Sequence, residues 1–249
     1  ELNMARAVIF DMGNTLMQFV RPGNGTWREF EDPGIRGVYQ YLVAQGHPLQ
    51  AHEDAFVEAM FARLAEGWAQ STGGQINLRA IDWIRAGAAD HALTLDEAAL
   101  LDAARHYARP LRQGVSATPG TLETLATLRA RGYHIGLISN TIWPAELHLE
   151  DLEEIGVLPY LEHPLFSGEL GLWKPNPAIF QHALELLGCA PEQAVFVGDS
   201  PREDIVGAQS VGMRAVWMRS REFPLGDVQP NATISALPEL LPWLETWFQ

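Results

Sequence analysis

The sequence predicts an α/β protein: a doubly wound, Rossmann-like core with a parallel sheet, and an inserted domain made only of helices. Short apolar runs end abruptly in polar residues, which is typical of strands buried on both faces of a parallel sheet. From Thr118 onward such runs alternate with segments of helical periodicity. The first two strand ends, at Asp11 and Ser139, are separated by far more than the dozen or so residues that a parallel crossover needs. This excess predicts the insertion.

The first strand is expected at residues 7–10, where four apolar residues precede Asp11. Between Met17 and Gly114 apolar residues recur at helical spacing over residues 34–45, 52–70 and 95–109. Because this block shows little strand pattern, we expect a helical cap domain at residues 17–114 and a core domain formed by residues 4–16 and 115–249. An insertion at this point would cover the sheet edge where ligands bind in open α/β folds.

The remaining elements alternate in the order expected of a doubly wound sheet. Pro119 and Gly120 open a helix that ends at Gly132, and Gly188 ends another helix that begins at Pro177. In chain order we expect a helix at 119–131, a strand at 134–138, a helix from 144, a helix at 177–187, a strand at 194–197, a helix up to 208, a strand at 214–218 and a final helix from 237.

The charge composition argues against one class of partner and raises a question about one residue. The 249 residues include 31 acidic and 17 basic side chains, a formal net charge of −14, which argues against a nucleic-acid partner. Lys174 is the only lysine among the basic residues. A lysine offers a compact point charge, whereas an arginine offers a planar fork, so this exception suggests a specific role.

Hydropathy and cysteine content set the expected location. No apolar run approaches the roughly 20 residues that cross a bilayer, and no signal-peptide pattern opens the chain. Cys189, the single cysteine, has no partner for an internal disulfide. We therefore expect a cytoplasmic protein without a membrane partner, and the oligomeric state stays open.

Two strand ends carry groups that suit the binding or the attack of an anion. Asp11 follows the first strand and begins the run DMGNT at residues 11–15. Such a run is equally typical of an ordinary turn and of a carboxylate beside a loop whose N–H groups face an anion. Ser139 and Asn140 end the next strand, where they form either a turn or helix cap, or a hydroxyl and N–H donors for phosphate oxygens.

Two further motifs carry charge. Lys174 precedes a helix that opens with Pro177. In a chain with several lysines this would be an ordinary position for a surface lysine, but here it holds the single lysine of the chain. Asp199 follows the strand at 194–197, and Asp204 lies about one helical turn further on. Acidic residues in a first helical turn are favoured by the helix dipole, but two carboxylates so placed can also share a hard cation such as Mg²⁺.

The order of these four motifs, rather than any one of them, closely resembles that of the haloacid dehalogenase-like hydrolase superfamily, in members with a helical cap inserted after the first motif. The resemblance is carried by FDMGNTL at residues 10–16, ISN at 138–140, KPNP at 174–177, VGDS at 197–200 and DI at 204–205. It extends from Ala5 to the last helix, and only the cap lacks recognisable motifs.

The resemblance implies a Mg²⁺-dependent phosphohydrolase that acts on a small phosphorylated metabolite. It makes Asp11 the nucleophile, which forms an aspartyl-phosphate that water then cleaves, and Lys174 the group that balances charge on Asp11 and the phosphate. The phosphoryl group would be bound by Ser139 and by the backbone of Asn140. The metal ligands would be the Asp11 carboxylate, the Gly13 carbonyl and Asp199, with Asp204 acting through the waters of the metal.

Gly13 departs from the family pattern. Phosphatases of the family usually carry a second aspartate at this position, two residues after the nucleophile, as general acid and base. The absence of this aspartate predicts one of three things: lower turnover, a substrate with a good leaving group, or a proton that comes from the substrate, from water or from the cap. Two alternatives stay open: a 2-haloacid dehalogenase that uses Asp11 without metal, because a halide needs no proton, and a catalytically weak phosphate- or partner-binding module. The retention of Asp199 and Asp204 favours the phosphatase.

The cap is expected to cover the pocket and to select the leaving group. For each polar or aromatic candidate in the cap, a place on its surface or in its core is the simpler interpretation; these candidates are Arg21, Trp27, Arg28, Trp83, Arg85 and His106. The eight histidines show no metal-ligand spacing.

Overall fold

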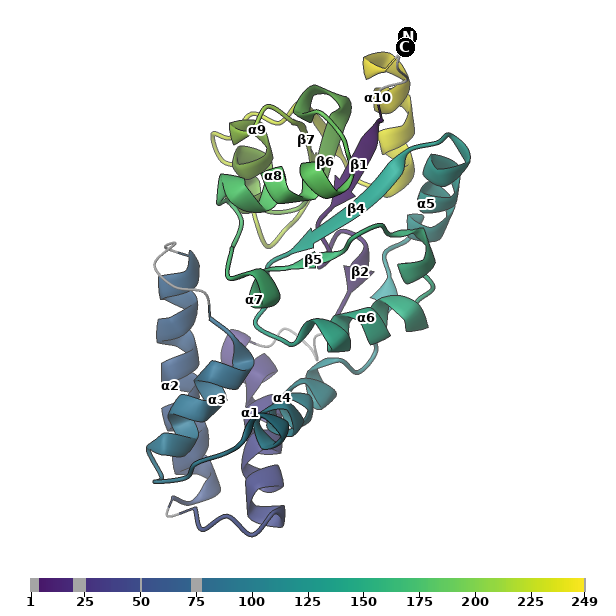
Figure 1. Cartoon of the computed structure of the whole chain (residues 1–249). Coiled ribbons are helices and arrows are strands. Elements are labelled where there is room, and N and C mark those ends of the chain that lie inside the picture. Colours follow the sequence, from purple (N-terminus) through teal and green to yellow (C-terminus); the bar gives the residue numbers. More distant parts are fainter. Residues whose placement is uncertain (1–4, 20–25, 50, 73–77, 249) are drawn as a thin grey trace. The chain divides into compact units, whose positions relative to one another are not determined.

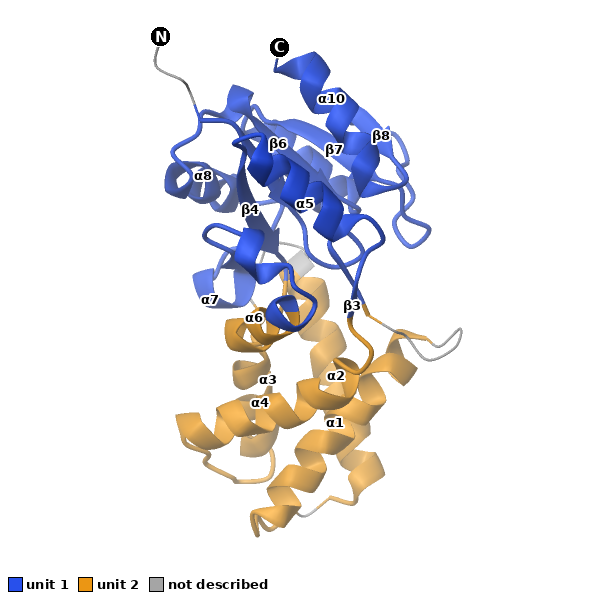
Figure 2. Cartoon of the chain, turned by 90° about the vertical axis from the view of Figure 1, so that its right-hand side faces the viewer, with its two compact units in different colours: residues 1–18, 116–140, 152–249 blue, residues 19–115, 141–151 orange. Residues whose placement is uncertain are grey.

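The computed structural model describes residues 5–19, 26–49, 51–72 and 78–248. Within these ranges the chain divides into two compact units, shown in different colours in Figure 2. Unit 1 contains Glu1–Gln18, Ser116–Asn140 and Leu152–Gln249, and unit 2 contains Phe19–Val115 and Thr141–Asp151. None of the described helices combines the length and the apolar character needed to cross a membrane.

Unit 1 is built on a parallel sheet of six strands in the order β5-β4-β1-β6-β7-β8. The strands are β1 (Ala7–Phe10), β4 (His134–Ser139), β5 (Leu165–Phe166), β6 (Ala194–Gly198), β7 (Arg214–Met218) and β8 (Ala232–Ile234). Each neighbouring pair is parallel, and β1, with every side chain buried, lies between β4 and β6. The doubly wound α/β fold predicted from the sequence is confirmed.

Helices cover both faces of this sheet. In Figure 1, α8 (Pro177–Leu186) and α9 (Gly207–Ser210) lie over one face, and α5 (Thr121–Ala130) and α10 (Leu240–Trp247) over the other. Apolar residues of α8 and α9 pack on the strands, for example Phe180 on Phe196 with ring centroids 5.2 Å apart. The remaining elements of this unit are α7 (Ser167–Leu170), the 3₁₀ turns η1 (Leu158–Tyr160), η2 (Pro191–Gln193) and η4 (Leu237–Glu239), and the π-helix η3 (Pro201–Val206).

Several elements of the structure are too short to leave a pattern in the sequence. The strands β5 and β8 have two and three residues, and β2 (Met17–Gln18) pairs with β3 (Ser116–Ala117) in a separate antiparallel pair of two residues a side. An apolar run of four or more residues is the usual sign of a buried strand, and these segments fall below that length. Most long elements appear where the sequence predicts them, with ends shifted by a few residues. The helix Trp27–Ala44 begins well before the expected residue 34, and the helix Ala80–Ala89 was not among the expected segments.

Four complete helices lie within the described residues of unit 2: α1 (Trp27–Ala44), α2 (Glu53–Thr72), α3 (Ala80–Ala89) and α4 (Glu97–Leu111). Thr26 and Glu29 form a capping box that begins α1, and the Asp96 side chain caps α4. Glycines bring α1 and α4 together, because a Cβ at Gly34 would lie 2.6 Å from the carbonyl oxygen of Tyr107. Only a residue without a side chain allows this approach.

One segment lies in a different unit from the one that the sequence-based boundaries give it. Thr141–Asp151 packs with the helices of unit 2, whereas the boundary at residue 114 assigns it to the core. The indole of Trp143 stacks on His148 at 5.2 Å and meets the ring of Tyr107 edge-on, and Arg112 bonds the Asp151 carboxylate at 2.8 Å. The helix α6 (Ala145–Glu154) therefore begins in unit 2 and ends in unit 1.

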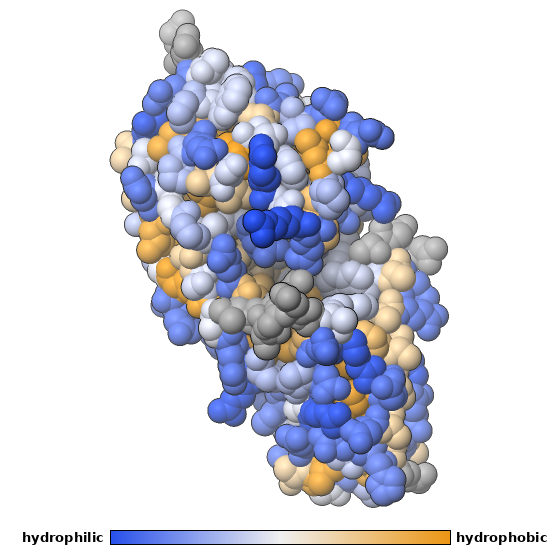
Figure 3. Space-filling view, turned by 180° about the vertical axis from the view of Figure 1, so that it is seen from behind, coloured by the Kyte–Doolittle hydropathy of each residue, from blue (hydrophilic) through white to orange (hydrophobic). Residues whose placement is uncertain are grey.

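The exposed surface has an ordinary distribution of polarity. Figure 3 shows hydrophilic residues over most of one face, with hydrophobic residues in small groups among them. Large apolar side chains that are exposed include Trp27, Trp68, Phe223 and Trp243. Single exposed apolar residues are normal on protein surfaces and need no functional explanation.

Candidate active site

Three of the predicted site residues lie at the carboxyl ends of neighbouring strands of unit 1. Asp11 follows β1, Ser139 is the last residue of β4, and Asp199 follows β6. The sheet fixes their register, since the amide of Asp11 donates to the Val197 carbonyl at 2.8 Å. The strand order β4-β1-β6 therefore brings together residues that are far apart in the sequence, at the edge where open α/β folds bind ligands.

The loop after β1 is a tight turn that directs one side chain at Asp199. The Met12 carbonyl accepts the amides of Leu16 and Met17 at 2.9 and 3.0 Å, which closes the turn. Asn14 adopts the left-handed conformation with φ of 56°, which asparagine tolerates better than most residues, and its Nδ2 donates to Asp199 Oδ2 at 3.3 Å. Among the described residues no donor bonds the Gly13 carbonyl.

Lys174 is buried and binds two of the acids. Its Nζ lies 2.7 Å from Asp11 Oδ1 and 2.7 Å from Asp204 Oδ1, and only 2% of the side chain is exposed. Burial lowers the pKa of Lys174, but the charges of Asp11 and Asp204 outweigh burial and hold that pKa above its ordinary value. The ammonium is therefore charged at neutral pH, and the single lysine of the chain lies at the centre of the candidate site.

The side chain of Asn140 has a function that the sequence did not indicate. Its Oδ1 accepts the amide of Lys174 at 2.8 Å, and its Nδ2 donates to the Lys174 carbonyl at 3.0 Å. This pair of bonds holds the backbone of Lys174, whose peptide bond to Pro175 is cis. From the sequence, only the backbone of Asn140 is expected to bind phosphate, because the partner of its side chain lies on a distant segment.

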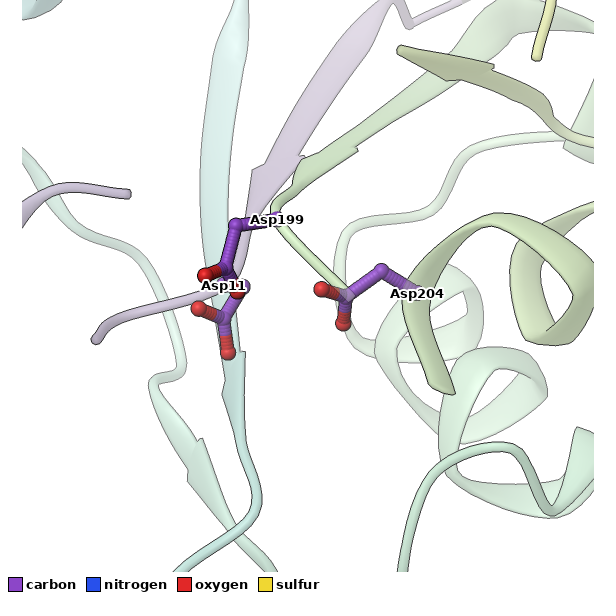
Figure 4. Close-up of side chains that lie close together, drawn as sticks. All are labelled: Asp11, Asp199 and Asp204. Carbon is purple, nitrogen blue, oxygen red and sulfur yellow. The ribbon is translucent and has the colours of Figure 1, made fainter. Parts of the chain in front are cut away.

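Asp11, Asp199 and Asp204 form a buried cluster of carboxylates. One oxygen of each lies within 4.8 Å of the others, and Figure 4 shows the three carboxylates turned toward one another. Asp204 accepts hydrogen bonds on both oxygens, from Lys174 and from the Ser200 amide at 2.9 Å. Burial and the neighbouring carboxylates raise the pKa of Asp199 well above its ordinary value, and burial raises that of Asp204 although Lys174 opposes it.

The charges of this cluster suit a divalent cation. Three ionised carboxylates and one ammonium leave two negative charges in a buried space, where burial above all, and then the neighbouring carboxylates, raise the pKa values of Asp199 and Asp204. Oxygen ligands of this kind are those that Mg²⁺ prefers. The residues present therefore fit a Mg²⁺ ion, with the carboxylates of Asp11 and Asp199 and the unbonded Gly13 carbonyl as available donors.

The conformation of Asp204 depends on a glycine beneath it. A Cβ at Gly198 would lie 2.3 Å from Asp204 Oδ2 and 2.4 Å from its Cγ. We expect Gly198→Ala to lower the free energy of unfolding by about 1–3 kcal/mol, the usual cost of overpacking, measured by urea denaturation. Gly13→Ala is the matched control, since a Cβ at Gly13 meets no atom within 4 Å, and its effect should stay within about 0.5 kcal/mol. Equal stability of both variants would contradict the close contact.

The candidate residues of the predicted cap make contacts inside unit 2. Arg21 lies outside the described residues. The indole of Trp83 donates to the Met60 carbonyl at 3.0 Å, and that of Trp27 donates to Glu31 at 2.9 Å. The other three candidates also have partners in unit 2, with Arg28 on Glu58, Arg85 on Asp82 and Glu97, and His106 stacked on Tyr41. These contacts agree with the simpler interpretation of a surface or core function.

Comparison with known proteins identifies the family. A model of the haloacid dehalogenase-like hydrolase family matches residues 5–212. The chain therefore belongs to this family of hydrolases, which confirms the resemblance seen in the order of the four motifs.

Relatives with assigned names extend the comparison. The chain is 31% identical over 246 residues to a phosphoglycolate phosphatase of Rhodospirillum rubrum, a match that covers 97% of this chain and 91% of the relative. It is 40% identical over 102 residues to a glyceraldehyde 3-phosphate phosphatase of Methanothermobacter thermautotrophicus, which covers 41% of this chain and 44% of that protein, less than half of its length. A 2-haloacid dehalogenase of Pseudomonas syringae pv. Tomato shares the fold, with 24% identity, a TM-score of 0.68 and coverage of 98% and 100%.

Proposed function

We propose that this chain is a Mg²⁺-dependent phosphohydrolase that acts on a small phosphorylated metabolite through an aspartyl-phosphate on Asp11. The observation that carries the proposal is the buried cluster of Asp11, Asp199 and Asp204 with Lys174 bonded to two of its members. The names of relatives that act as phosphoglycolate and glyceraldehyde 3-phosphate phosphatases support a phosphorylated substrate. Cys189, buried and without a disulfide, agrees with a cytoplasmic location as part of the same proposal.

Asp11 carries out the chemical step in this proposal. Its carboxylate attacks phosphorus and displaces the leaving group. Water then attacks the same phosphorus and breaks its bond to the Asp11 oxygen, which releases inorganic phosphate and the free aspartate. Lys174 holds the carboxylate at 2.7 Å and offsets the charge that an anionic nucleophile meets when it approaches an anionic phosphate. The Ser139 hydroxyl and the backbone N–H of Asn140 bind phosphoryl oxygens. The side-chain amide of Asn140 keeps Lys174 in position.

Three donors of this chain would hold Mg²⁺: the carboxylates of Asp11 and Asp199 and the Gly13 carbonyl. Bound there, the ion supplies the positive charge that phosphoryl transfer requires. Asp204 holds Lys174 at 2.7 Å, and it would also support a bound ion through that ion's waters. Asn14 supports the same site, since its amide fixes one oxygen of Asp199.

A 2-haloacid dehalogenase remains the second candidate, because Gly13 lacks the acidic side chain that a phosphatase uses to protonate its leaving group. A halide needs no proton, so Asp11 could displace it without a metal ion. Asp199 and Asp204 have no clear use in such a reaction, yet both are buried in the cluster. The phosphatase therefore accounts for more of the site. A module that binds phosphate without turnover accounts for less, since every expected charged group except an acid at position 13 is present.

One assay separates these candidates. We expect the protein to hydrolyse p-nitrophenyl phosphate with Mg²⁺ and to lose at least about 100-fold in rate when EDTA removes the ion, since metal stabilisation of charge is worth several kcal/mol. Release of chloride from 2-chloropropionate that persists in EDTA would establish the dehalogenase instead. Binding of inorganic phosphate without turnover of either compound would favour the binding module.

A further inference from the structure

A cavity of about 450 Å³ lies in unit 1, beside the acid cluster and at the carboxyl ends of β7 and β8. The residues that matter for its chemistry are Asn14, Arg219, Ser220, Arg221, Glu222 and Ser235. Its volume falls in the range of small-molecule sites. The catalytic proposal above uses none of the residues that follow β7 and β8, so the cavity has no function in that proposal.

Two arginines of this cavity have no acidic partner within the described residues. Arg219 and Arg221 are both exposed, and neither forms an ion pair there. Several other arginines of the chain bond carboxylates; for example, Arg112 binds Asp151 at 2.8 Å, and Arg131 binds Glu245 at 2.8 Å. In a chain of net charge −14, two arginines that line one cavity and have no ion pair among the described residues form a local positive site for an anion.

The loop that carries these arginines is held by hydrogen bonds. The amide of Arg219 donates to the Ile234 carbonyl at 2.8 Å, which ties the start of the loop to β8. Ser220 Oγ accepts the amides of Glu222 and Phe223 at 3.2 and 3.3 Å, a turn that sets Arg219 and Arg221 on either side of the serine. Because this oxygen is the acceptor in both bonds, its own hydrogen remains able to donate to a ligand.

The donors of the cavity match an anionic oxygen group. Two guanidinium forks and the Ser220 hydroxyl offer only donors to a ligand in this arrangement, and such forks bind carboxylate or phosphate in pairs of hydrogen bonds. Glu222 is the one acidic residue among the described residues of the lining, and it already has an interaction within the chain. The two arginines therefore exceed the acidic charge of the lining by one unit.

Asn14 connects the cavity with the catalytic residues. It lines the cavity, and its Nδ2 also donates to Asp199 at 3.3 Å. An oxygen of Asp199 lies within 4.8 Å of one of Asp11. The cavity thus begins one side chain away from the acid cluster, at the same edge of the sheet.

We propose that this cavity is a second anion subsite, in which Arg219 and Arg221 bind a carboxylate or phosphate group. The inference rests on the proposed phosphohydrolase function and narrows its substrate class to phosphate monoesters that carry another anionic group. The same chemistry could also hold a separate small anion, and the two sources give different results in the test below.

The test compares the whole chain with R219Q/R221Q on two substrates in the presence of Mg²⁺. 2-Phosphoglycolate carries a carboxylate and p-nitrophenyl phosphate does not. We expect the KM for 2-phosphoglycolate, relative to that for p-nitrophenyl phosphate, to rise about ten- to hundredfold in the double variant, the value of one or two charge-assisted hydrogen bonds. Arg131→Gln is the control, because it also replaces an arginine by glutamine but at a position outside the cavity lining. The ratio of its KM for 2-phosphoglycolate to its KM for p-nitrophenyl phosphate should equal that of the native chain.

Calorimetry with glycolate, which has a carboxylate and no phosphate, gives a readout that does not need turnover. Glycolate binding that is present in the native chain and lost in R219Q/R221Q, with an unchanged KM ratio, would assign the subsite to a separate anion. An unchanged ratio together with equal or absent glycolate binding in both proteins would overturn the proposal. If neither substrate is hydrolysed, the phosphohydrolase function fails, and glycolate binding still decides the subsite.

Discussion

Asp11→Asn is expected to reduce the turnover of p-nitrophenyl phosphate by about 10⁴-fold or more, the range seen when a covalent nucleophile is removed. An amide is a poor nucleophile, and the variant also loses the negative charge that Lys174 and a metal ion would hold. The loss should appear in kcat, since Ser139, Asn140 and Lys174 remain to bind the phosphoryl group. Steady-state kinetics with saturating Mg²⁺ measure the effect.

The control for this variant is Asp227→Asn, the same change at an exposed aspartate. Its rate should match that of the native chain. Acid quenching with labelled substrate should detect phosphate attached to the native protein and to Asp227→Asn, and none attached to Asp11→Asn. Native turnover by Asp11→Asn would remove Asp11 as the nucleophile, and with it the aspartyl-phosphate.

Gly13→Asp is expected to raise kcat for phosphate esters with poor leaving groups by about 10²-fold or more, because general acid–base catalysis is worth ~10²–10⁴ in rate. The structure has room for the new side chain: a Cβ at Gly13 meets no atom within 4 Å, and the backbone there is outside the left-handed region. An alkyl phosphate such as glycerol 3-phosphate needs a proton on its departing oxygen. p-Nitrophenolate departs without one, so its release should gain far less.

Gly13→Asn provides the matched control, since it has nearly the shape of aspartate and cannot transfer a proton in the same way. It should leave the ratio of the two rates near that of the native chain. The dependence of kcat on leaving-group pKa, measured over a series of aryl and alkyl phosphates, should be steep for the native chain and shallower for Gly13→Asp. An equal dependence in both would mean that position 13 does not limit proton transfer.

The positions of the chemical groups could be predicted because parallel strands end at a common edge. Asp11, Ser139 and Asp199 each follow or end an apolar run, so local sequence was sufficient to predict that they lie together. Because Lys174 is the only lysine of the chain, the sequence also predicted a specific function for it at this site. Its two bonds, to Asp11 and Asp204, agree with that expectation.

Other features of the site could not be predicted, because they depend on contacts between distant segments. The side chain of Asn140 clamps Lys174, which is 34 residues away, and Asn14 reaches Asp199 across 185 residues. The segment Thr141–Asp151 packs with the helical unit because Trp143 finds His148 and Tyr107, and no local pattern indicates such a partner. The arginines after β7 are equally ordinary in sequence.

The sequence by itself determined the fold class, the family and the order of the chemical groups, since each of these follows from periodicity and from short motifs at strand ends. The tertiary structure decided which charged side chains lie close together and which have no partner of opposite charge among the described residues. It brings three carboxylates within 4.8 Å of one another around a single buried ammonium, and among the described residues it leaves Arg219 and Arg221, which line the cavity with Asn14, without an ion pair. Electrostatic energy depends on distance and burial, and only the folded chain defines both.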